Sequence, residues 1–305
     1  MPESISRRGF LQASAVSAVA ASVGSPASRA ADRPIPGDIV TPRPERKYQL
    51  GMVTYNIAPD WDIPTIIERC RELGLAAVEL RSTHKHGVEP TLSKAERREV
   101  RKRFADSPVR LWGLGSACEY HSTDPAVVAK NIELTKQFIE LAADVGAATL
   151  KVRPNGLPKE VSEEQTLEQI GRSLRTVGQA AEAAGVEICC EMHGHGTSEP
   201  RHMRRIMEIA DHPAVGVTWN SNPVDVQNET IRHSFEMMRP WIRNVHINEL
   251  TSTYPWRELF TLLRSAGYDR YTLMEIQNLQ TQDPKDVMRF LRFYKALWEE
   301  LSRPC

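Results

Sequence analysis

Residues 186–196 read VEICCEMHGHG, and they combine two features that are seldom found together. The first half is a short apolar run, which is typical of a buried strand. The second half is a glycine-rich loop with one carboxylate and two imidazoles. Charged side chains are rarely buried unless they are paired or coordinated. A buried strand that leads into Glu191 and His193 therefore predicts that its carboxyl end opens into a site.

Strand-like and helix-like segments alternate regularly on both sides of this stretch. Helix starts are marked by an N-cap at Asp62, by Asp124 before a proline, and by a capping box from Ser162 to Gln165. The predicted strands are residues 50–56, 76–81, 109–116, 149–153, the first part of 186–196, 215–219, 242–248 and 271–276. The predicted helices are residues 62–73, 93–105, 124–145, 162–184, 200–210, 224–238, 256–266 and 284–302.

Eight strand–helix units with no second cluster of strands predict one closed barrel. Strands joined by crossover helices run parallel, and a (β/α)8 TIM barrel takes about 250 residues. An open, doubly wound sheet is disfavoured because TYNIAP follows the first strand at residues 54–59, where a dinucleotide-binding sheet carries Gly-x-Gly-x-x-Gly. The predicted fold class is α/β, with a single TIM-barrel catalytic domain at residues 48–302.

The first 47 residues have a different character. Arg7 and Arg8 precede an Ala/Val/Ser run, and small residues around Ala30 suit a signal peptidase. They predict a Tat-type signal peptide at residues 1–30, passage through the Tat translocase and a periplasmic location. A chance arginine pair before a disordered tail is the alternative. The proline-rich residues 31–47 suit a linker.

Composition limits the classes of partner. Lys plus Arg and Asp plus Glu number 39 each, so the formal net charge is zero and nothing indicates nucleic acid or an anionic membrane surface. Because no apolar run reaches the roughly 18 residues needed to span a bilayer, we expect no stable membrane anchor. The five cysteines lack metal-finger spacing and are interpreted as free thiols. A homo-oligomer remains one option.

Polar side chains follow most of the predicted strands, at the end where a TIM barrel carries its active site. Each has a structural explanation alone, such as a salt bridge between Glu79 and Arg81 or a core histidine at His246. Four successive strands that end on oxygen or nitrogen ligands are harder to explain in this way. The residues at the strand ends are Glu79, Arg81, Glu119, His121, Lys151, Arg153, Glu191, His193, Asn220, Asn222, His246, Asn248, Glu249, Glu275 and Gln277.

These ligand types indicate a metal. Carboxylates, an amide oxygen and an imidazole form a hard to borderline set that suits Mn²⁺, Mg²⁺ or Co²⁺, with Zn²⁺ a further candidate. Four protein ligands on a cation that favours six leave about two positions for a substrate. A carbonyl next to a hydroxyl, as in a sugar, fits that arrangement.

Several motifs, taken together, resemble the xylose-isomerase-like sugar isomerase/epimerase superfamily over about residues 48–300. They are AVELR at 77–81, Glu191-x-His193, VGVTWN at 215–220, VHINE at 245–249 and the GYD and ME motifs within 267–275. The resemblance implies that Glu191, Asn220, His246 and Glu275 hold the metal, with Mn²⁺ favoured. It also implies that Glu191 and Glu275 are the catalytic acid/base pair on opposite faces of the sugar.

Two positions depart from the family pattern. Asn220 stands where the family has aspartate, and Pro223 stands where it often has histidine. With a neutral ligand at residue 220, we expect the metal to be held more weakly but to be more electrophilic toward a carbonyl. The substrate-binding candidates are Arg81, His121, Lys151, Arg153, His193, Asn222 and Glu249.

The predicted function is a divalent-metal-dependent sugar isomerase or epimerase. It would abstract a proton α to a carbonyl, through an enediolate, from a non-phosphorylated or keto sugar, since no phosphate-cradling glycine loop is present. One alternative is a metal-dependent lyase that cleaves 3-keto-glycosides by β-elimination. Another is a non-catalytic sugar-binding barrel in which Asn220 marks a disabled metal site. A phosphodiesterase-like nuclease of the same superfamily is disfavoured because its extra His and Asp ligands are missing.

Overall fold

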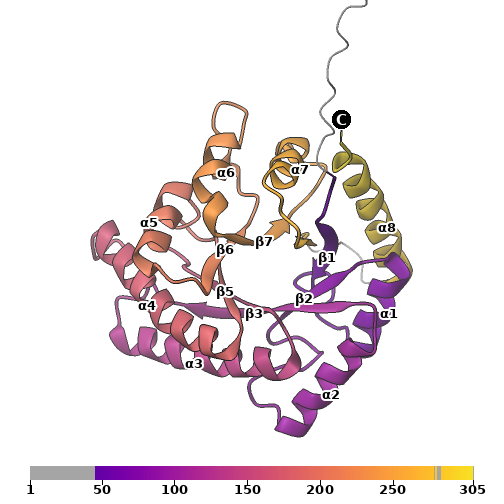
Figure 1. Cartoon of the computed structure of the whole chain (residues 1–305), viewed down its shortest axis with the longest axis horizontal. Helices are drawn as coiled ribbons and strands as arrows, with labels where there is room; N and C mark the ends of the chain where they lie inside the picture. The colour runs from indigo at the N-terminus through magenta and orange to yellow at the C-terminus, as the bar shows by residue number, and fades with distance from the viewer. Residues whose placement is uncertain (1–44, 278, 280–282, 305) are drawn as a thin grey trace, which may run out of the picture. The chain divides into compact units, whose positions relative to one another are not determined.

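The computed structural model of the protein describes residues 45–277, 279 and 283–304. Its strands are parallel and form a closed barrel in the order β1 to β8, with β1 paired to β8. Figure 1 shows the helices as a ring outside the strands. The predicted (β/α)8 TIM barrel is confirmed. The strands are β1 (Gln49–Val53), β2 (Ala77–Arg81), β3 (Arg110–Glu119), β4 (Thr149–Arg153), β5 (Glu187–Glu191), β6 (Val215–Trp219), β7 (Ile242–Ile247) and β8 (Tyr271–Met274). The helices are α1 (Ile63–Leu73), α2 (Lys94–Ala105), α3 (Pro125–Val145), α4 (Glu163–Ala184), α5 (Pro200–Ala210), α6 (Arg232–Met238), α7 (Trp256–Ser265) and α8 (Pro284–Leu301).

Helix boundaries follow local sequence signals. Asp62 accepts a hydrogen bond from the backbone N–H of Thr65 at the start of α1, and Ser162 and Gln165 form the predicted capping box of α4. At the other end of α4, Gly185 takes a left-handed conformation with φ of 70°, which glycine adopts without strain. These caps set the length of each crossover and so the place where the next strand begins.

The apolar core lies mainly between the strands and the ring of helices. Inside the barrel, a smaller cluster of residues from four strands fills the interior, and it consists of Val53, Ala77, Trp112 and Leu273. Toward the carboxyl ends of the strands the interior becomes polar. The buried charged or ionisable residues there are Glu79, Lys151, Glu191 and His246. The fold therefore places a group of mutually close ionisable side chains at one end of the barrel.

The largest disagreement with the sequence prediction lies after β6. The sequence predicts a single helix over residues 224–238. This prediction is wrong for the first half of the segment. A 3₁₀ turn covers Pro223–Asp225, and α6 begins only at Arg232. Asn228 and Glu229 have positive φ angles of 49° and 65°, which a continuous right-handed helix cannot contain. Strand β3 is also longer than predicted, because it continues to Glu119.

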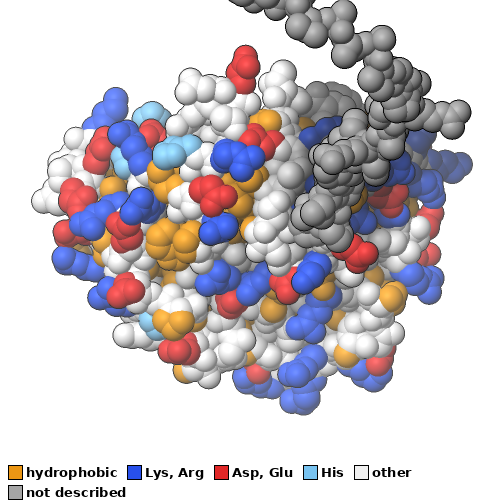
Figure 2. Space-filling model, turned by 45° about the horizontal axis from the view of Figure 1, so that its top comes forward, with side chains coloured by type: hydrophobic (Ala, Val, Ile, Leu, Met, Phe, Trp, Pro, Cys, Tyr) orange, Lys and Arg blue, Asp and Glu red, His pale blue; other side chains and the backbone are white. Residues whose placement is uncertain are grey.

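The predicted export signal and most of the predicted linker lie outside the described residues. Among the helices that are described, none combines the length and the apolar character needed to cross a membrane. On the face shown in Figure 2, basic and acidic side chains are interspersed over the described residues. The four described cysteines are buried free thiols, as predicted, and Cys305 is not described.

Candidate active site

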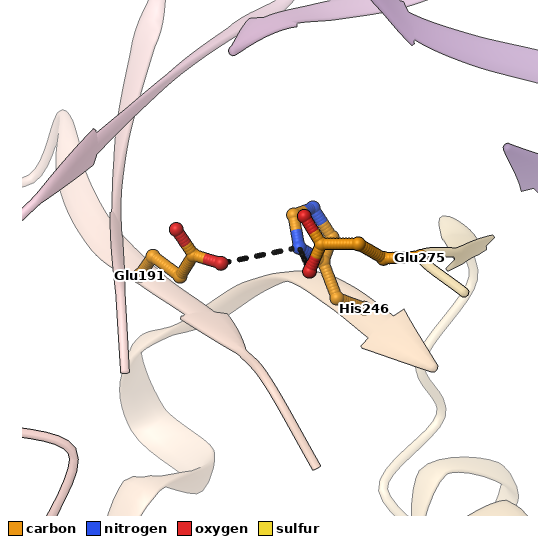
Figure 3. A group of neighbouring side chains, drawn as sticks. All are labelled: Glu191, His246 and Glu275. Carbon is orange, nitrogen blue, oxygen red and sulfur yellow. Dashed lines mark hydrogen bonds and ion pairs between the residues drawn. The ribbon is translucent and has the colours of Figure 1, made fainter. Parts of the chain in front are cut away.

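Three residues of the predicted metal set meet at the carboxyl end of the barrel. Glu191 ends β5, His246 lies in β7, and Glu275 follows β8; one ligand atom of each lies within 4.8 Å of the others. Nδ1 of His246 is 3.6 Å from Oε1 of Glu191 and 3.1 Å from Oε2 of Glu275. Figure 3 shows both carboxylates directed at this ring nitrogen from different strands. The barrel therefore assembles one imidazole and two carboxylates from three separate segments.

Asn220, the fourth predicted ligand, follows β6 and is 7% exposed. Asn248 holds its backbone, since Nδ2 of Asn248 donates to the carbonyl oxygen of Asn220 at 3.1 Å. Among the described residues, Oδ1 of Asn220 has no hydrogen-bond partner. Leaving a buried acceptor unsatisfied costs about 1–3 kcal/mol, and a cation would satisfy it. This orphaned oxygen and the cluster of Glu191, His246 and Glu275 fit a divalent metal.

Lys151 adds a buried positive charge to the cluster. Its ammonium lies 2.6 Å from Oε2 of Glu191, and both side chains are almost fully buried. Burial opposes ionisation, but Lys151 and His246 hold the pKa of Glu191 well below its usual range. Burial likewise lowers the pKa of His246, yet the carboxylates of Glu275 and Glu79 outweigh it and raise that pKa well above the ordinary value. Without a metal, Lys151 and a protonated His246 therefore offset most of the negative charge of the surrounding carboxylates.

Glu79 is the residue whose environment sequence reasoning missed. The suggested salt bridge with Arg81 is wrong, because Arg81 donates to the carbonyl oxygen of Ser82 at 3.1 Å. Oε2 of Glu79 instead accepts from Nδ2 of Asn244 at 3.0 Å and lies 3.4 Å from Nε2 of His246. The sequence signal for part of this arrangement is the two-residue period of a strand, which places the side chains of Asn244 and His246 on the same face of β7.

The rim over β3 and β4 holds another group of predicted substrate-binding residues. Arg153 forms an ion pair with Glu119, and Nδ1 of His121 lies 3.9 Å from Oε2 of the same glutamate. His193, in the loop after β5, contacts Oδ1 of Asn155 through Nδ1 at 2.9 Å. The three predicted residues Arg153, His121 and His193 are partly exposed at this end of the barrel. Their part in binding stays a prediction.

The remaining candidates hold loops together. Nδ2 of Asn222 donates to the carbonyl oxygen of Met192 at 2.6 Å, which ties the loop after β6 to the end of β5. Oε1 of Glu249 accepts from the backbone N–H of Gln277 at 2.8 Å, which ties the loop after β7 to the end of β8. These hydrogen bonds position the segments that follow the strands. Whether Asn222 and Glu249 also contact substrate stays a prediction.

Asp225 is a second buried carboxylate that the sequence did not single out. It is fully buried in the 3₁₀ turn after β6, and burial raises its pKa to about 7. Oδ2 accepts from the backbone N–H of Asn222 at 2.7 Å and from the hydroxyl of Tyr254 at 3.1 Å. Trp219 in turn donates from Nε1 to the Tyr254 hydroxyl at 3.1 Å. This chain connects the loop after β6 to the loop after β7.

A cavity of about 410 Å³ opens between the same two loops. Ser221 and Asn248 belong to its lining, and they follow closely on Asn220 and His246 in the chain. The cavity therefore lies between the segments that follow Asn220 and His246, although neither of these two residues lines it. Its other lining residues include Pro223, Val226, Glu249 and Tyr254.

Comparisons with known proteins agree with this fold. The family model for the xylose isomerase-like TIM barrel matches residues 67–296. The chain is 23% identical over 201 residues to a ketose 3-epimerase from Arthrobacter globiformis, and the match covers 62% of this chain and 69% of that protein. D-psicose 3-epimerase with D-tagatose from Clostridium cellulolyticum H10 superposes with a TM-score of 0.72 at 15% identity, over 84% of this chain and 100% of that chain. A 3-keto-D-glucoside 4-epimerase from E. coli superposes with a TM-score of 0.65 at 17% identity, over 81% and 100%.

Proposed function

This chain belongs to the xylose isomerase-like TIM barrel family, and from that premise we propose that it is a divalent-metal-dependent sugar isomerase or epimerase. The observation that carries the proposal is the meeting of Glu191, His246 and Glu275 at the carboxyl end of the barrel. The named activities of the relatives support it, since these are epimerases of ketoses and of a keto-glucoside. The proposed substrate is a non-phosphorylated or keto sugar.

Glu191, Asn220, His246 and Glu275 would hold the metal. Mn²⁺ is the ion we propose first, because oxygen ligands with one imidazole suit it; Mg²⁺, Co²⁺ and Zn²⁺ also fit this set. A bound ion would polarise the substrate carbonyl and stabilise the negative charge that develops on its oxygen. The orphaned Oδ1 of Asn220 supports a cation here rather than a further hydrogen-bonded network.

The two glutamates differ in ways that suit different roles. Glu275 is 12% exposed and has no lysine partner, whereas Glu191 is 3% exposed and is held ionised by Lys151. Glu275 is therefore the better-placed base for the C–H bond next to the carbonyl. The electron pair of that bond enters the enediolate. A proton would then return from the Glu191 side of the sugar, supplied by the ammonium of Lys151 through Glu191, either to the same carbon with inversion or to the neighbouring carbon.

The cavity between the loops after β6 and β7 favours a second candidate. Its volume is about 410 Å³, and we propose that it takes the aglycone of a glycoside whose sugar ring binds at the metal cluster. The same base could then remove the proton α to a 3-keto group. The electron pair would form a C=C bond, and the glycosidic oxygen β to the keto group would leave with its own electron pair. That reaction is the lyase alternative.

One experiment separates these reactions. The Mn²⁺-loaded protein is incubated in D₂O with D-fructose, D-psicose and D-tagatose, and separately with p-nitrophenyl 3-keto-glucoside, while deuterium uptake and nitrophenol release are followed. Uptake without release supports the isomerase or epimerase, and release supports the lyase. Glu275→Gln should abolish either reaction, whereas Glu140→Gln, at an exposed glutamate of α3, should leave it unchanged.

Activity without added metal, or unchanged activity in Glu275→Gln, would contradict the proposal. A third result would be that neither uptake nor release occurs with any of these sugars and that Glu275→Gln binds sugar as well as wild type. This result would instead favour the non-catalytic sugar-binding barrel.

A further inference from the structure

Glu79 is a carboxylate buried inside the barrel that the proposed reaction does not use. It lies in β2 and is 0% exposed. Oε2 meets two groups from β7, namely Nδ2 of Asn244 at 3.0 Å and Nε2 of His246 at 3.4 Å. A buried charged group is costly unless it is paired or hydrogen-bonded. The burial of a carboxylate at this position therefore needs an explanation.

Two glycines of β3 lie next to Glu79, and one of them, Gly115, makes room for its carboxylate. A Cβ at Gly115 would lie only 3.0 Å from Oε1 of Glu79, and a Cβ at Gly113 would lie 3.5 Å from its Cγ and 2.4 Å from Oγ1 of Thr149. Neither glycine has a positive φ angle, so backbone conformation does not explain them. The absence of a side chain at Gly115 therefore leaves room for the Glu79 carboxylate, whereas its absence at Gly113 leaves room for Thr149.

Asn244 fixes which groups face Glu79. The indole N–H of Trp112 donates to Oδ1 of Asn244 at 3.1 Å. Because an indole nitrogen can only donate, the amide oxygen of Asn244 must point to Trp112 and its NH₂ group to Glu79. Asn244 thus presents a donor to Oε2 of Glu79, and that oxygen is an acceptor for His246 as well.

The two ring nitrogens of His246 face different carboxylates. Nδ1 faces Glu191 and Glu275. Nε2 lies 3.4 Å from Oε2 of Glu79 and 3.3 Å from Nδ2 of Asn244, and that amide nitrogen donates to Glu79 at the shorter distance of 3.0 Å. We propose that Glu79 is a positioning residue that accepts the Nε2–H of His246 and so directs the Nδ1 lone pair at the metal cluster. A histidine ligand commonly donates its other N–H to a carboxylate, which fixes both tautomer and ring orientation. This inference rests on the proposed metal site.

The charges of the cluster support a carboxylate at residue 79. Asn220 is a neutral ligand, and Lys151 brings a positive charge next to Glu191. Glu191 and Glu275 alone cannot balance both Lys151 and a divalent cation. With Glu79 as a third carboxylate, the group is neutral when the metal is bound. Glu79 therefore supplies the charge that a strand-six aspartate would otherwise bring.

The first test uses the wild-type protein with Zn²⁺, which is diamagnetic. Zn²⁺ affinity is measured by calorimetry, and the ring nitrogens of His246 are observed in ¹⁵N-histidine-labelled protein by long-range ¹H–¹⁵N correlation. In the Zn²⁺-bound protein we expect Nε2 to carry a proton and Nδ1 to have lost its proton and shifted. A proton retained on Nδ1 of the Zn²⁺-bound protein, or Zn²⁺-dependent loss of the proton on Nε2, would overturn the role of Glu79 while leaving a metal site. Failure of Zn²⁺ to bind would overturn both proposals.

Variants then test the hydrogen bond itself. Glu79→Leu should weaken Zn²⁺ binding about 10–100-fold and remove the single tautomer, as is typical when such a partner of a histidine ligand is lost. Glu79→Gln should lose less than about tenfold and keep the single tautomer, because its amide oxygen can accept the same N–H although the negative charge is gone. Asp225→Asn is the matched control, since Asp225 is equally buried but bonds to Asn222 and Tyr254; its affinity should be unchanged.

Two results would contradict this scheme. One is wild-type affinity and an unchanged His246 spectrum in Glu79→Leu. The other is an equal loss in Glu79→Gln and Glu79→Leu, which would show that charge alone matters and that the acceptor for Nε2–H does not. Should Glu79→Leu fail to fold, the wild-type spectrum and the Glu79→Gln affinity still decide the question.

Discussion

Nζ of Lys151 lies 2.6 Å from Oε2 of Glu191, and their side chains are only 5% and 3% exposed. Few ion pairs in proteins are buried so completely, because removing two charges from water costs several kcal/mol per ion before their attraction is counted. Here the lysine also lies close to Glu79 and Glu275, whose charges raise its pKa although burial opposes them. Lys151 therefore stabilises a cluster whose carboxylates would otherwise repel one another.

Replacing Lys151 with methionine should destabilise the metal-free protein by about 3–5 kcal/mol, since it leaves Glu191 buried and unpaired. Urea unfolding in the presence of a chelator measures this loss. Adding Mn²⁺ should restore more stability to the variant than to wild type, because the cation replaces the missing charge.

Lys94→Met is the matched control for that comparison. Lys94 pairs with Asp144 at 2.6 Å, but its side chain is 66% exposed. Exposed pairs contribute about 0–1 kcal/mol, so the control should lose little stability and gain nothing extra from Mn²⁺. Equal losses in the two variants would contradict the assigned role of Lys151.

Asn220→Asp should bind divalent metal more tightly than wild type, by about tenfold or more, because ligand charge strengthens the binding of hard cations. Calorimetric titration with Mn²⁺ at neutral pH measures the change. Asn222→Asp is a suitable comparison, since the Asn222 side chain donates to the carbonyl oxygen of Met192 and is not part of the predicted metal set. An aspartate at residue 220 that leaves the affinity unchanged would exclude this residue as a ligand.

Much of the barrel was predictable because its signals are local. Asp62, Ser162 and Gln165 mark helix starts through contacts within one turn, and the structure shows those contacts. The helix predicted over residues 224–238 failed because Asp225 bonds to Tyr254, nearly thirty residues away, and this contact holds the turn in place of a helix. No periodicity in the sequence records such a pairing.

Part of the candidate site could likewise be predicted from the sequence, and part of it could not. Glu191, His246 and Glu275 could be grouped because parallel strands bring their carboxyl ends to one rim. The partners of Glu79 could not be predicted from the sequence. Asn244 and His246 are more than 160 residues away in the chain, and the contact depends on the register around the closed barrel. Gly115 of β3, which leaves room for Glu79, carries no chemical signal of its own.

Gly194→Ala should destabilise the protein by more than Gly185→Ala. Both glycines have a positive φ angle, 90° and 70°, so both substitutions strain the backbone. Only at residue 194 would the new Cβ also meet backbone atoms, which lie 2.7 Å away in Asn155, while nothing lies within 4 Å at residue 185. Thermal unfolding of the two variants measures the difference, and equal losses would show that the Asn155 segment moves freely away from His193.

Asp225→Asn should change the pH dependence of stability. Burial raises the pKa of Asp225 from 3.8 to about 7 in the folded protein. Between these values the folded state keeps a proton that the unfolded state has lost, so the free energy of unfolding falls as pH rises through about 4 to 7. By pH 8 this cost reaches at most about 4 kcal/mol.

Asparagine carries no such proton and can accept the same two hydrogen bonds through its amide oxygen. Relative to wild type, Asp225→Asn should therefore be nearly neutral at pH 4 and gain up to a few kcal/mol by pH 8. Urea unfolding at a series of pH values gives the difference directly, with Asp269→Asn as an exposed comparison. A difference between variant and wild type that does not change with pH would mean that Asp225 is already ionised in the folded protein, with Tyr254 and Asn222 stabilising its charge.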